Sequence, residues 1–458
     1  MRTPLLYRFN RLVVRLGMRA YFREIEVTGR SRIPAAGPVI FAANHPHSIT
    51  DSLVLGLAAD RMVHFIAHSG LFRNRLQAWF LRNSGVVPVH RPRDDAAASD
   101  RNQTMFATCF RILGDGGAIG IFPEGTSAEE RRVQKLKTGA ARIALGAEEQ
   151  AAWQLGLTLV PVGLNFESST RFRSRVLVKF GHPLLPADWR PEFAADAQAA
   201  GVKLTEVLQE RMRHEVVNIK QSEYEVFVRD VKMIFKKEIL ERTDLTIPGN
   251  SPYQRDQNIT AEIARALDYF YERSPDVVWR LARQIKRYNT RRRFLKLRDE
   301  LLSREQGPEV RGELWRLVIM GIAGLPWALF GLAGNWLPFQ LTAWLGARLA
   351  PDRTKTHLIQ FCVGAALFPG WYALLLYFAQ RIFGSAALLP VGLGLPVAGL
   401  FAREYFRYMK TRRRLLRFAA LEVMLGVRVQ ELRLERRRLV ANLDRAMNQY
   451  LAALEEEA

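Results

Sequence analysis

The chain has 458 residues, of which 48% are hydrophobic and 24% are charged, so it can hold two or three structural units and is not disordered throughout. Its formal net charge of +22 requires an anionic partner, and nucleic acid, anionic lipid and phosphorylated substrates are the three candidate classes. The only two cysteines, Cys109 and Cys362, exclude a disulfide framework and a clustered thiolate metal site.

The first predicted element is a basic amphipathic helix within residues 1–23. Arginines at three- and four-residue spacing share one face, and apolar side chains cover another. The arginines are Arg8, Arg11, Arg15 and Arg19, and the apolar residues are Leu5, Phe9, Leu12, Val13 and Leu16. Such a helix fits either an anionic bilayer surface or the surface of the following domain, and both interpretations stay open.

Residues 24–220 are predicted to form an α/β domain, because short apolar runs alternate with amphipathic stretches. The predicted strands cover residues 38–43, 62–67, 86–89, 118–122, 157–166 and 176–180, and the predicted helices end near residues 57, 82, 113 and 150. Four strands end in polar or glycine-rich turns at His45, Arg91, Glu124 and Asn165. Sites in open α/β sheets form at the carboxyl ends of strands, so chemistry is expected at these turns.

The rest of the chain is predicted to be helical. Residues 221–316 are highly charged, which fits a solvated face or a basic surface turned to a membrane. Residues 317–402 contain charge-free runs at 317–347, 358–380 and 382–402, and each is long enough for a membrane-spanning helix of roughly 20 residues. Residues 403–458 are predicted to form a long amphipathic helical tail.

Arginines flank the apolar region on both sides, before Leu317 and from Arg403 onward. The positive-inside bias therefore places both flanks in the cytoplasm and requires an even number of crossings. The second and third runs form a natural hairpin with Arg381 at its outer turn. The first run is either a broken, re-entrant hairpin that turns near Asn335, the preferred interpretation, or two short crossings. We expect an integral membrane protein with two to four apolar helices and the α/β domain on the cytoplasmic face.

The most informative local feature is the segment from Asn44 to Asp51, directly after a predicted strand. His45 can take the proton of an alcohol as a general base, and Asp51 can hold the imidazole tautomer. The substrate hydroxyl then occupies the place that serine takes in a Ser-His-Asp triad. His47 is an alternative base in the same segment.

Three further segments follow or form predicted strands. Gly85 to Arg91 delivers a guanidinium that can bind phosphate bidentately. Phe122 to Ser127, with the sequence FPEGTS and followed by Lys135 and Lys137, offers glycine, amide and hydroxyl groups to a phosphate or an oxyanion. Val160 to Asn165 is a buried strand that is expected to border the acyl or thioester channel.

These four motifs, in this order between Val27 and Gly181, resemble the phospholipid/glycerol acyltransferase (PlsC-like) family, and FPEGT is the most distinctive. The resemblance implies a mixed sheet flanked by helices. It also implies transfer of a fatty acyl group from a thioester to a hydroxyl of a glycerol phosphate in phosphatidic acid and phospholipid biosynthesis. The implied catalytic residues are His45 as base and Asp51 as its partner. The implied acceptor and phosphate-site residues are Arg91, Glu124, Gly125, Thr126 and Lys137.

Two positions depart from the pattern of most of the family. Five residues separate His45 from Asp51 where four are usual, and this spacing is similar to the glycerol-3-phosphate/dihydroxyacetone-phosphate acyltransferase branch. Within the family the histidine follows an asparagine, as His45 follows Asn44, which favours His45 over His47 as the base. Ser127 stands where many relatives have arginine, which removes one possible phosphate contact.

Two other function classes stay open from the sequence. A metal-dependent hydrolase would use His45, His47 and Asp51, completed by His64, His68 or His90. A non-catalytic basic protein would bind membrane lipid by charge alone. The acyltransferase interpretation requires no metal or cofactor and no nucleic acid. It leaves open the donor carrier (coenzyme A or acyl carrier protein), the acceptor (glycerol-3-phosphate, dihydroxyacetone phosphate or 1-acylglycerol-3-phosphate) and the oligomeric state.

Overall fold

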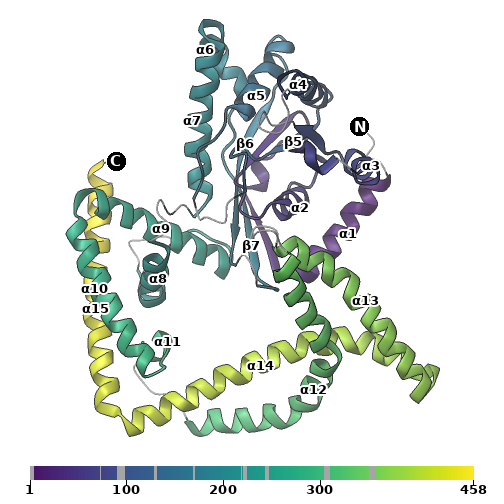
Figure 1. Ribbon diagram of the computed structural model, residues 1–458. Coiled ribbons are helices and arrows are strands. Elements are labelled where there is room, and N and C mark those ends of the chain that lie inside the picture. The colour runs from purple at the N-terminus through teal and green to yellow at the C-terminus, as the bar shows by residue number, and fades with distance from the viewer. Residues whose placement is uncertain are drawn as a thin grey trace. The chain divides into compact units, whose positions relative to one another are not determined.

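The computed structural model describes residues 5–72, 74–89, 98–127, 132–168, 171–217, 219, 224–242, 247–303, 310–349 and 356–457 (Figure 1). The chain divides into two compact units. The first consists of Met1–Ser222, Pro248–Ala261 and Ala350–Phe361, and the second of Glu223–Ile247, Glu262–Leu349 and Cys362–Ala458.

Within the described residues, the first unit contains a seven-stranded sheet in the order β1-β7-β6-β2-β5-β3-β4 (Figure 1). The strands are β1 (Glu24–Thr28), β2 (Val39–Ala43), β3 (Val63–His68), β4 (Val87–Val89), β5 (Ala118–Ile121), β6 (Thr158–Phe166) and β7 (Arg175–Phe180). Neighbouring strands are parallel except β6 and β7, which are antiparallel. The predicted α/β class with a mixed sheet is confirmed, and β1 is an edge strand that the sequence patterns did not predict.

Helices cover both faces of this sheet, because the side chains of the central strands alternate between two apolar clusters. In β2, Ile40 and Ala42 join one cluster with residues of α4, α5 and α7, whereas Val39 and Phe41 join the other with residues of α1 and α2. The helices of this unit are α1 (Leu5–Tyr21), α2 (Ile49–Ala58), α3 (Arg75–Asn83), α4 (Ala98–Gly114), α5 (Gly139–Gln150), α6 (Arg190–Ala195), α7 (Ala197–Glu215) and the start of α9 (Pro252–Arg273).

The charged part of the second unit is helical, as predicted. It comprises α8 (Tyr224–Glu241), the remainder of α9, α10 (Pro275–Phe294), α11 (Asp299–Leu302) and α15 (Gly426–Glu457). Ion pairs and hydrogen bonds connect α15 to α10 and α11, so these helices form one bundle.

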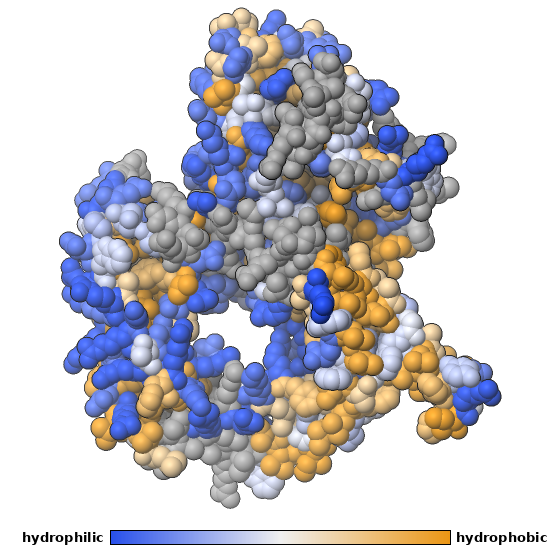
Figure 2. Space-filling view, viewed as in Figure 1, coloured by the Kyte–Doolittle hydropathy of each residue, from blue (hydrophilic) through white to orange (hydrophobic). Residues whose placement is uncertain are grey.

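The apolar part of the second unit consists of α12 (Val310–Leu349), α13 (Thr356–Phe383) and α14 (Leu388–Met424). Among the described residues, three segments are long and apolar enough to cross a membrane: Trp315–Leu349, Ile359–Phe383 and Ser385–Arg413. Figure 2 shows the hydrophobic surface that they expose. A protein with three such helices is a membrane protein.

The predicted interruption of the helix near Asn335 is wrong, because α12 is helical on both sides of that residue; the predicted re-entrant path is a separate matter and stays a prediction. Pro338 lacks an N–H and leaves the carbonyl of Gly334, four residues earlier, without its helical donor. Trp371 of α13 supplies a donor instead, with Nε1 2.8 Å from that oxygen. A proline therefore stays inside the helix because another helix satisfies the freed carbonyl.

Candidate active site

The candidate site lies at one edge of the sheet, where parallel strands have their carboxyl ends. β2 runs between β5 and β6, with Ala42 paired to Ile121 and Ala43 paired to Val162. The predicted site segments follow β2 and β5 directly, so both segments start at the same edge. Ligands of open α/β sheets bind at such an edge.

His45 and Asp51 contact each other at this edge. His45 follows β2, Asp51 lies in the first turn of α2, and His45 Nδ1 is 2.9 Å from Asp51 Oδ2. The Asp51 side chain is fully buried, whereas the imidazole keeps 18% of its surface exposed. The hydrogen bond at Nδ1 leaves Nε2 as the nitrogen that can accept a proton from a hydroxyl. The structure thus brings the predicted base and its carboxylate partner together.

The loop between the two residues accommodates the five-residue spacing. Ser48 has a φ of 54° and a ψ of −126°, a strained conformation that costs of order 1–3 kcal/mol. The backbone N–H of Asp51 then donates to Ser48 O at 3.1 Å. The strained residue lets the chain enter α2 with the carboxylate still turned towards His45.

Burial raises the pKa of Asp51, and this is the largest influence on the group. The hydrogen bond and charge of His45 and the backbone N–H of His47, 2.7 Å from Asp51 Oδ2, oppose the shift. The carboxylate therefore takes up a proton at a higher pH than an exposed aspartate.

His47, the alternative base, lies in a different environment. Its side chain is 3% exposed, and its ring meets Phe166 edge-on with the centroids 4.4 Å apart. His47 donates a hydrogen bond to Asp51 from its backbone N–H. Of the two histidines, His45 is the one that combines exposure with a side-chain contact to the carboxylate.

Phe122 is a site residue that the sequence did not single out. Its ring stacks on His45, with the centroids 4.1 Å apart and the planes at 14°, and Phe65 lies parallel to Phe122 at 6.2 Å. The stacking fixes the plane of the His45 imidazole, and the hydrogen bond from Nδ1 to Asp51 fixes its rotation within that plane. The signal was present, since Phe122 begins the FPEGTS motif, but the sequence does not reveal that β5 neighbours β2.

Two asparagines fasten the chain around the site. The Asn44 amide donates to Leu164 O at 3.2 Å, and its oxygen accepts from Leu164 N at 2.7 Å, which ties the end of β2 to β6. The Asn165 amide donates to Glu215 O at 2.9 Å, at the end of α7. The β6 motif therefore contributes packing and anchoring to the site.

The turn after β5 brings Lys137 to Gly125. Gly125 has a φ of 72° and donates its N–H to Phe122 O at 3.0 Å, so this N–H is used within the turn. A Cβ at Gly125 would lie 2.7 Å from Lys137 Nζ. Only glycine leaves room for the ammonium group here.

The two neighbours of Gly125 in this turn differ in exposure. Glu124 is 5% exposed, whereas Thr126 is exposed. The turn therefore offers a carboxylate on its buried side and a hydroxyl on its open side.

Arg91, the predicted phosphate ligand, and His90 lie outside the described residues. The strand that precedes them, β4, is parallel to β3, and β3 is parallel to β5. The carboxyl end of β4 is therefore at the same edge of the sheet as the ends of β2 and β5.

The histidines proposed to complete a metal site make other contacts. His64 Nδ1 is 3.0 Å from Gly85 O, and His68 Nδ1 accepts the backbone N–H of Gly70 at 3.1 Å. His64 therefore contacts the turn before β4, and His68 contacts the turn that follows β3.

Comparison with known proteins identifies the domain. Residues 24–165 match the family model "Acyltransferase". Glycerol-3-phosphate O-acyltransferase 1 of Saccharomyces cerevisiae is 26% identical over 271 residues, which are 57% of this chain and 33% of the yeast protein. A 1-acyl-sn-glycerol-3-phosphate acyltransferase of Bacillus subtilis is 27% identical over 215 residues, which are 45% of this chain and 96% of the bacterial protein.

The chain spans about a third of the length of several of these relatives: 33% of the yeast protein and 36% of a chloroplastic 1-acyl-sn-glycerol-3-phosphate acyltransferase of Arabidopsis thaliana. Among solved structures, the 1-acyl-sn-glycerophosphate acyltransferase PlsC of Thermotoga maritima matches with a TM-score of 0.33 and 19% identity, over 46% of this chain and 80% of that protein.

Proposed function

We propose that the chain acylates a small phosphate-bearing alcohol, because residues 24–165 match the acyltransferase family model and the relatives include a glycerol-3-phosphate and a 1-acyl-sn-glycerol-3-phosphate acyltransferase. The donor is a fatty acyl thioester of coenzyme A or acyl carrier protein. The acceptor is glycerol-3-phosphate or a relative, dihydroxyacetone phosphate or 1-acylglycerol-3-phosphate. The observation that carries the proposal is the partly exposed His45 held by the buried Asp51 at the sheet edge.

In the proposed reaction His45 Nε2 takes the proton of the acceptor hydroxyl as its oxygen attacks the thioester carbonyl carbon. The tetrahedral intermediate collapses, the C–S bond breaks, and the thiolate takes the proton from the imidazolium. Asp51 stabilises that imidazolium and Phe122 holds its plane. The products are an ester and a free thiol, and the mechanism uses neither a metal nor an acyl-enzyme.

Cationic groups would fix the acceptor by its phosphate. Lys137 lies over Gly125, and we assign Arg91 to the same phosphate. The exposed Thr126 would hydrogen-bond to the phosphate, and the buried Glu124 would hold the second oxygen substituent of the acceptor. Anchoring at one end of a small molecule aims its hydroxyl at His45, and such positioning is a large part of catalysis.

The test measures transfer from labelled acyl-CoA and acyl carrier protein to each of the three acceptors with the detergent-solubilised chain. We expect His45→Ala to lower turnover by about 10² to 10⁴. The matched control is His214→Ala, an exposed histidine at the end of α7, which should leave turnover unchanged. Wild-type transfer by His45→Ala would refute the proposal.

A second measurement tests the phosphate site separately. Arg91→Ala and Lys137→Ala should raise the KM for the phosphorylated acceptor and leave the KM for the acyl donor unchanged, because the lost contacts are to phosphate alone. An unchanged acceptor KM in both variants would show that the phosphate is held elsewhere.

A further inference from the structure

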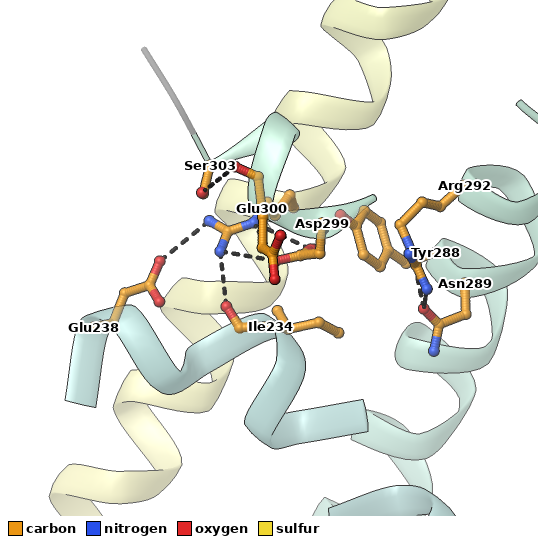
Figure 3. Close-up of polar contacts among 9 residues, drawn as sticks. Ile234, Glu238, Tyr288, Asn289, Arg292, Asp299, Glu300 and Ser303 are labelled. Carbon is orange, nitrogen blue, oxygen red and sulfur yellow. Dashed lines mark hydrogen bonds and ion pairs between the residues drawn. The ribbon is translucent and has the colours of Figure 1, made fainter. Parts of the chain in front are cut away.

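The chain enters and leaves its apolar region at one folded bundle. Arg436 of α15 makes 3.2 Å contacts from Nε to both carboxylate oxygens of Asp299 in α11, and it donates to Glu238 at 3.1 Å and to Ile234 O at 2.7 Å in α8 (Figure 3). Tyr288 of α10 donates to the same Asp299 at 2.5 Å. The Arg436 side chain is only 7% exposed and that of Asp299 2%, so this polar cluster is an interior feature of the bundle.

This cluster joins the two ends of the membrane region. α11 ends at Leu302, eight residues before α12, and α15 begins at Gly426, two residues after α14 ends. A folded bundle lies on one face of a membrane. The chain between its two halves must therefore cross an even number of times, although the region contains three helices long enough to cross.

The first residues of α13 lie on that same face. Within the first unit, the hydroxyl of Tyr21 donates to Gln360 Oε1 at 3.0 Å, and the Phe361 ring fills the space over Gly17. Gln360 and Phe361 therefore stay with the α/β domain. The chain passes from that domain to the bundle through α9, whose seven charged residues cannot cross a bilayer.

Both ends of the membrane region lie on one face of the membrane, and so does the start of α13. We therefore infer that α12 is re-entrant: it enters the bilayer and returns to the same face. The helices α13 and α14 then form the one hairpin that crosses the membrane. The count is then two crossings, since α12 contributes none. The turn at Gly384 and Ser385 is the part of the chain that reaches the opposite face.

The packing of α12 fits a bent path. At about 1.5 Å per residue its 40 residues extend about 60 Å, twice the roughly 30 Å of a hydrocarbon core. Its first half packs antiparallel to α14, with Gly331 against Ala398, and its second half packs against α13, with Gly364 against Thr342. The helix changes direction where the two halves meet (Figure 1).

A polar junction holds this bend. The Asn335 amide donates to Gly331 O at 2.9 Å and to Leu395 O of α14 at 3.0 Å, and its oxygen accepts from the Tyr372 hydroxyl of α13 at 2.5 Å. Trp371 satisfies the carbonyl that Pro338 frees. In a hydrocarbon environment such groups need partners, and here one asparagine connects all three helices.

The charge pattern is consistent with the same topology. Arg316 and Arg348 stand near the two ends of α12, and Arg403 and Arg407 follow the apolar part of α14. Arg381 alone stands near the hairpin turn. The positive-inside bias makes the face with the bundle the cytoplasmic one.

Single reporter cysteines test the inference in a Cys109→Ala, Cys362→Ala background. The reporters are Trp315→Cys and Leu349→Cys at the ends of α12, Ser385→Cys at the hairpin turn and Ala452→Cys in α15, all at exposed positions. A membrane-impermeant maleimide should label Trp315→Cys, Leu349→Cys and Ala452→Cys only in inverted vesicles, and Ser385→Cys only in intact cells. The inference is overturned if Leu349→Cys is labelled from the side opposite to that of Trp315→Cys. It is also overturned if Ser385→Cys is labelled from the same side as Trp315→Cys.

The unaltered chain provides a second measurement that needs no cysteine variant. Trypsin added outside right-side-out vesicles should cut after Arg381 and at no other site between residues 310 and 424. Arg381→Gln should abolish this cleavage. Cleavage after Arg348 from that side would mean that α12 crosses the membrane.

Discussion

At the scale of single residues, the stacking of Phe122 on His45 has a measurable consequence. Phe122→Leu keeps an apolar side chain but removes the flat surface that fixes the imidazole plane. We expect kcat to fall roughly tenfold or more with little change in KM, because misorientation of a catalytic group affects the transition state and not ground-state binding. Steady-state kinetics with saturating donor would measure this split.

Phe122→Trp is the control for this substitution, since it restores an aromatic face and should recover much of the lost kcat. Phe65→Leu, one ring further from His45, should have a smaller effect. If Phe122→Leu raised KM and left kcat intact, the ring would be a binding residue and not a positioning one.

The burial of Asp51 predicts opposite effects of one substitution on activity and stability. Burial raises the pKa of Asp51 in the folded state, so the protonated carboxyl favours the folded state. This contribution to the free energy of unfolding is complete below the ordinary aspartate pKa of 3.8 and is lost as the pH rises through the folded pKa. Asp51→Asn should therefore be as stable as the parent near pH 4 and equally or more stable at pH 8, while its kcat falls by about 10² or more. Thermal melting and kinetics across this range would measure both.

A stability deficit of Asp51→Asn that grew with pH would contradict this account, because it would mean that the ionised carboxylate stabilises the fold. In the parent, activity should fall on the acidic side as Asp51, whose pKa is raised by burial, takes up a proton.

The sequence predicted the dyad but not its surroundings. His45 and Asp51 are close in the chain, so the sequence alone indicates that they form a pair. Gly125 and Lys137 could be predicted together because Lys137 follows the FPEGTS motif. Phe122, Asn44 and the use of the Gly125 N–H inside its own turn depend on which strands are neighbours. Strand order is a long-range property that periodicity does not encode.

At the scale of elements, α1 has an apolar face with no protein partner in the described part of the chain. Leu12, Val13 and Leu16 are 53%, 48% and 59% exposed, whereas Met18 on the other side is buried. The predicted interfacial helix would place these three side chains in the acyl boundary of an anionic bilayer. A nitroxide at Leu16→Cys in the cysteine-free background should then meet oxygen more often than a polar nickel reagent.

The neighbouring Arg15→Cys is the matched control, since Arg15 is exposed and lies on the basic face of the same helix. Its nitroxide should favour the polar reagent. Equal accessibility of the two positions in lipid nanodiscs would assign α1 to the domain surface instead.

The close approach of α12 and α14 predicts a strong effect of side-chain volume at Gly331. A Cβ there would lie 1.9 Å from Ala398 O, so Gly331→Leu must push the helices apart. We expect a loss of about 1–3 kcal/mol, as for other overpacked sites, and a lower melting temperature in detergent. Gly370→Leu in α13, where a Cβ meets nothing within 4 Å, should change stability by less than about 0.5 kcal/mol.

The elements themselves were largely predictable, because their apolar periods are strong. The strands from residue 38 to residue 180 and the helices between them agree with the structure within a few residues. β1 was missed because its sequence, EIEVT, contains no run of adjacent apolar residues. The continuity of α12 was missed because the donor that tolerates Pro338 comes from Trp371, a residue of another helix.

At the scale of the whole molecule, the Arg436 cluster determines how firmly the ends of the membrane region are held together. Arg436→Met would leave the Asp299 carboxylate buried without its cation, and breaking one partner of a buried pair costs about 3–5 kcal/mol. Arg436→Met combined with Asp299→Leu removes both charges and should recover most of that loss, since apolar replacement of a buried pair is often neutral. A double-mutant cycle on the thermal unfolding of the detergent-solubilised chain would measure the coupling.

Arg437→Met, at a residue next to Arg436 on an exposed part of α15, is the matched control and should be close to neutral. If Arg436→Met and the double variant were equally destabilised, the arginine would act by packing alone, and the bundle would be held by its apolar contacts.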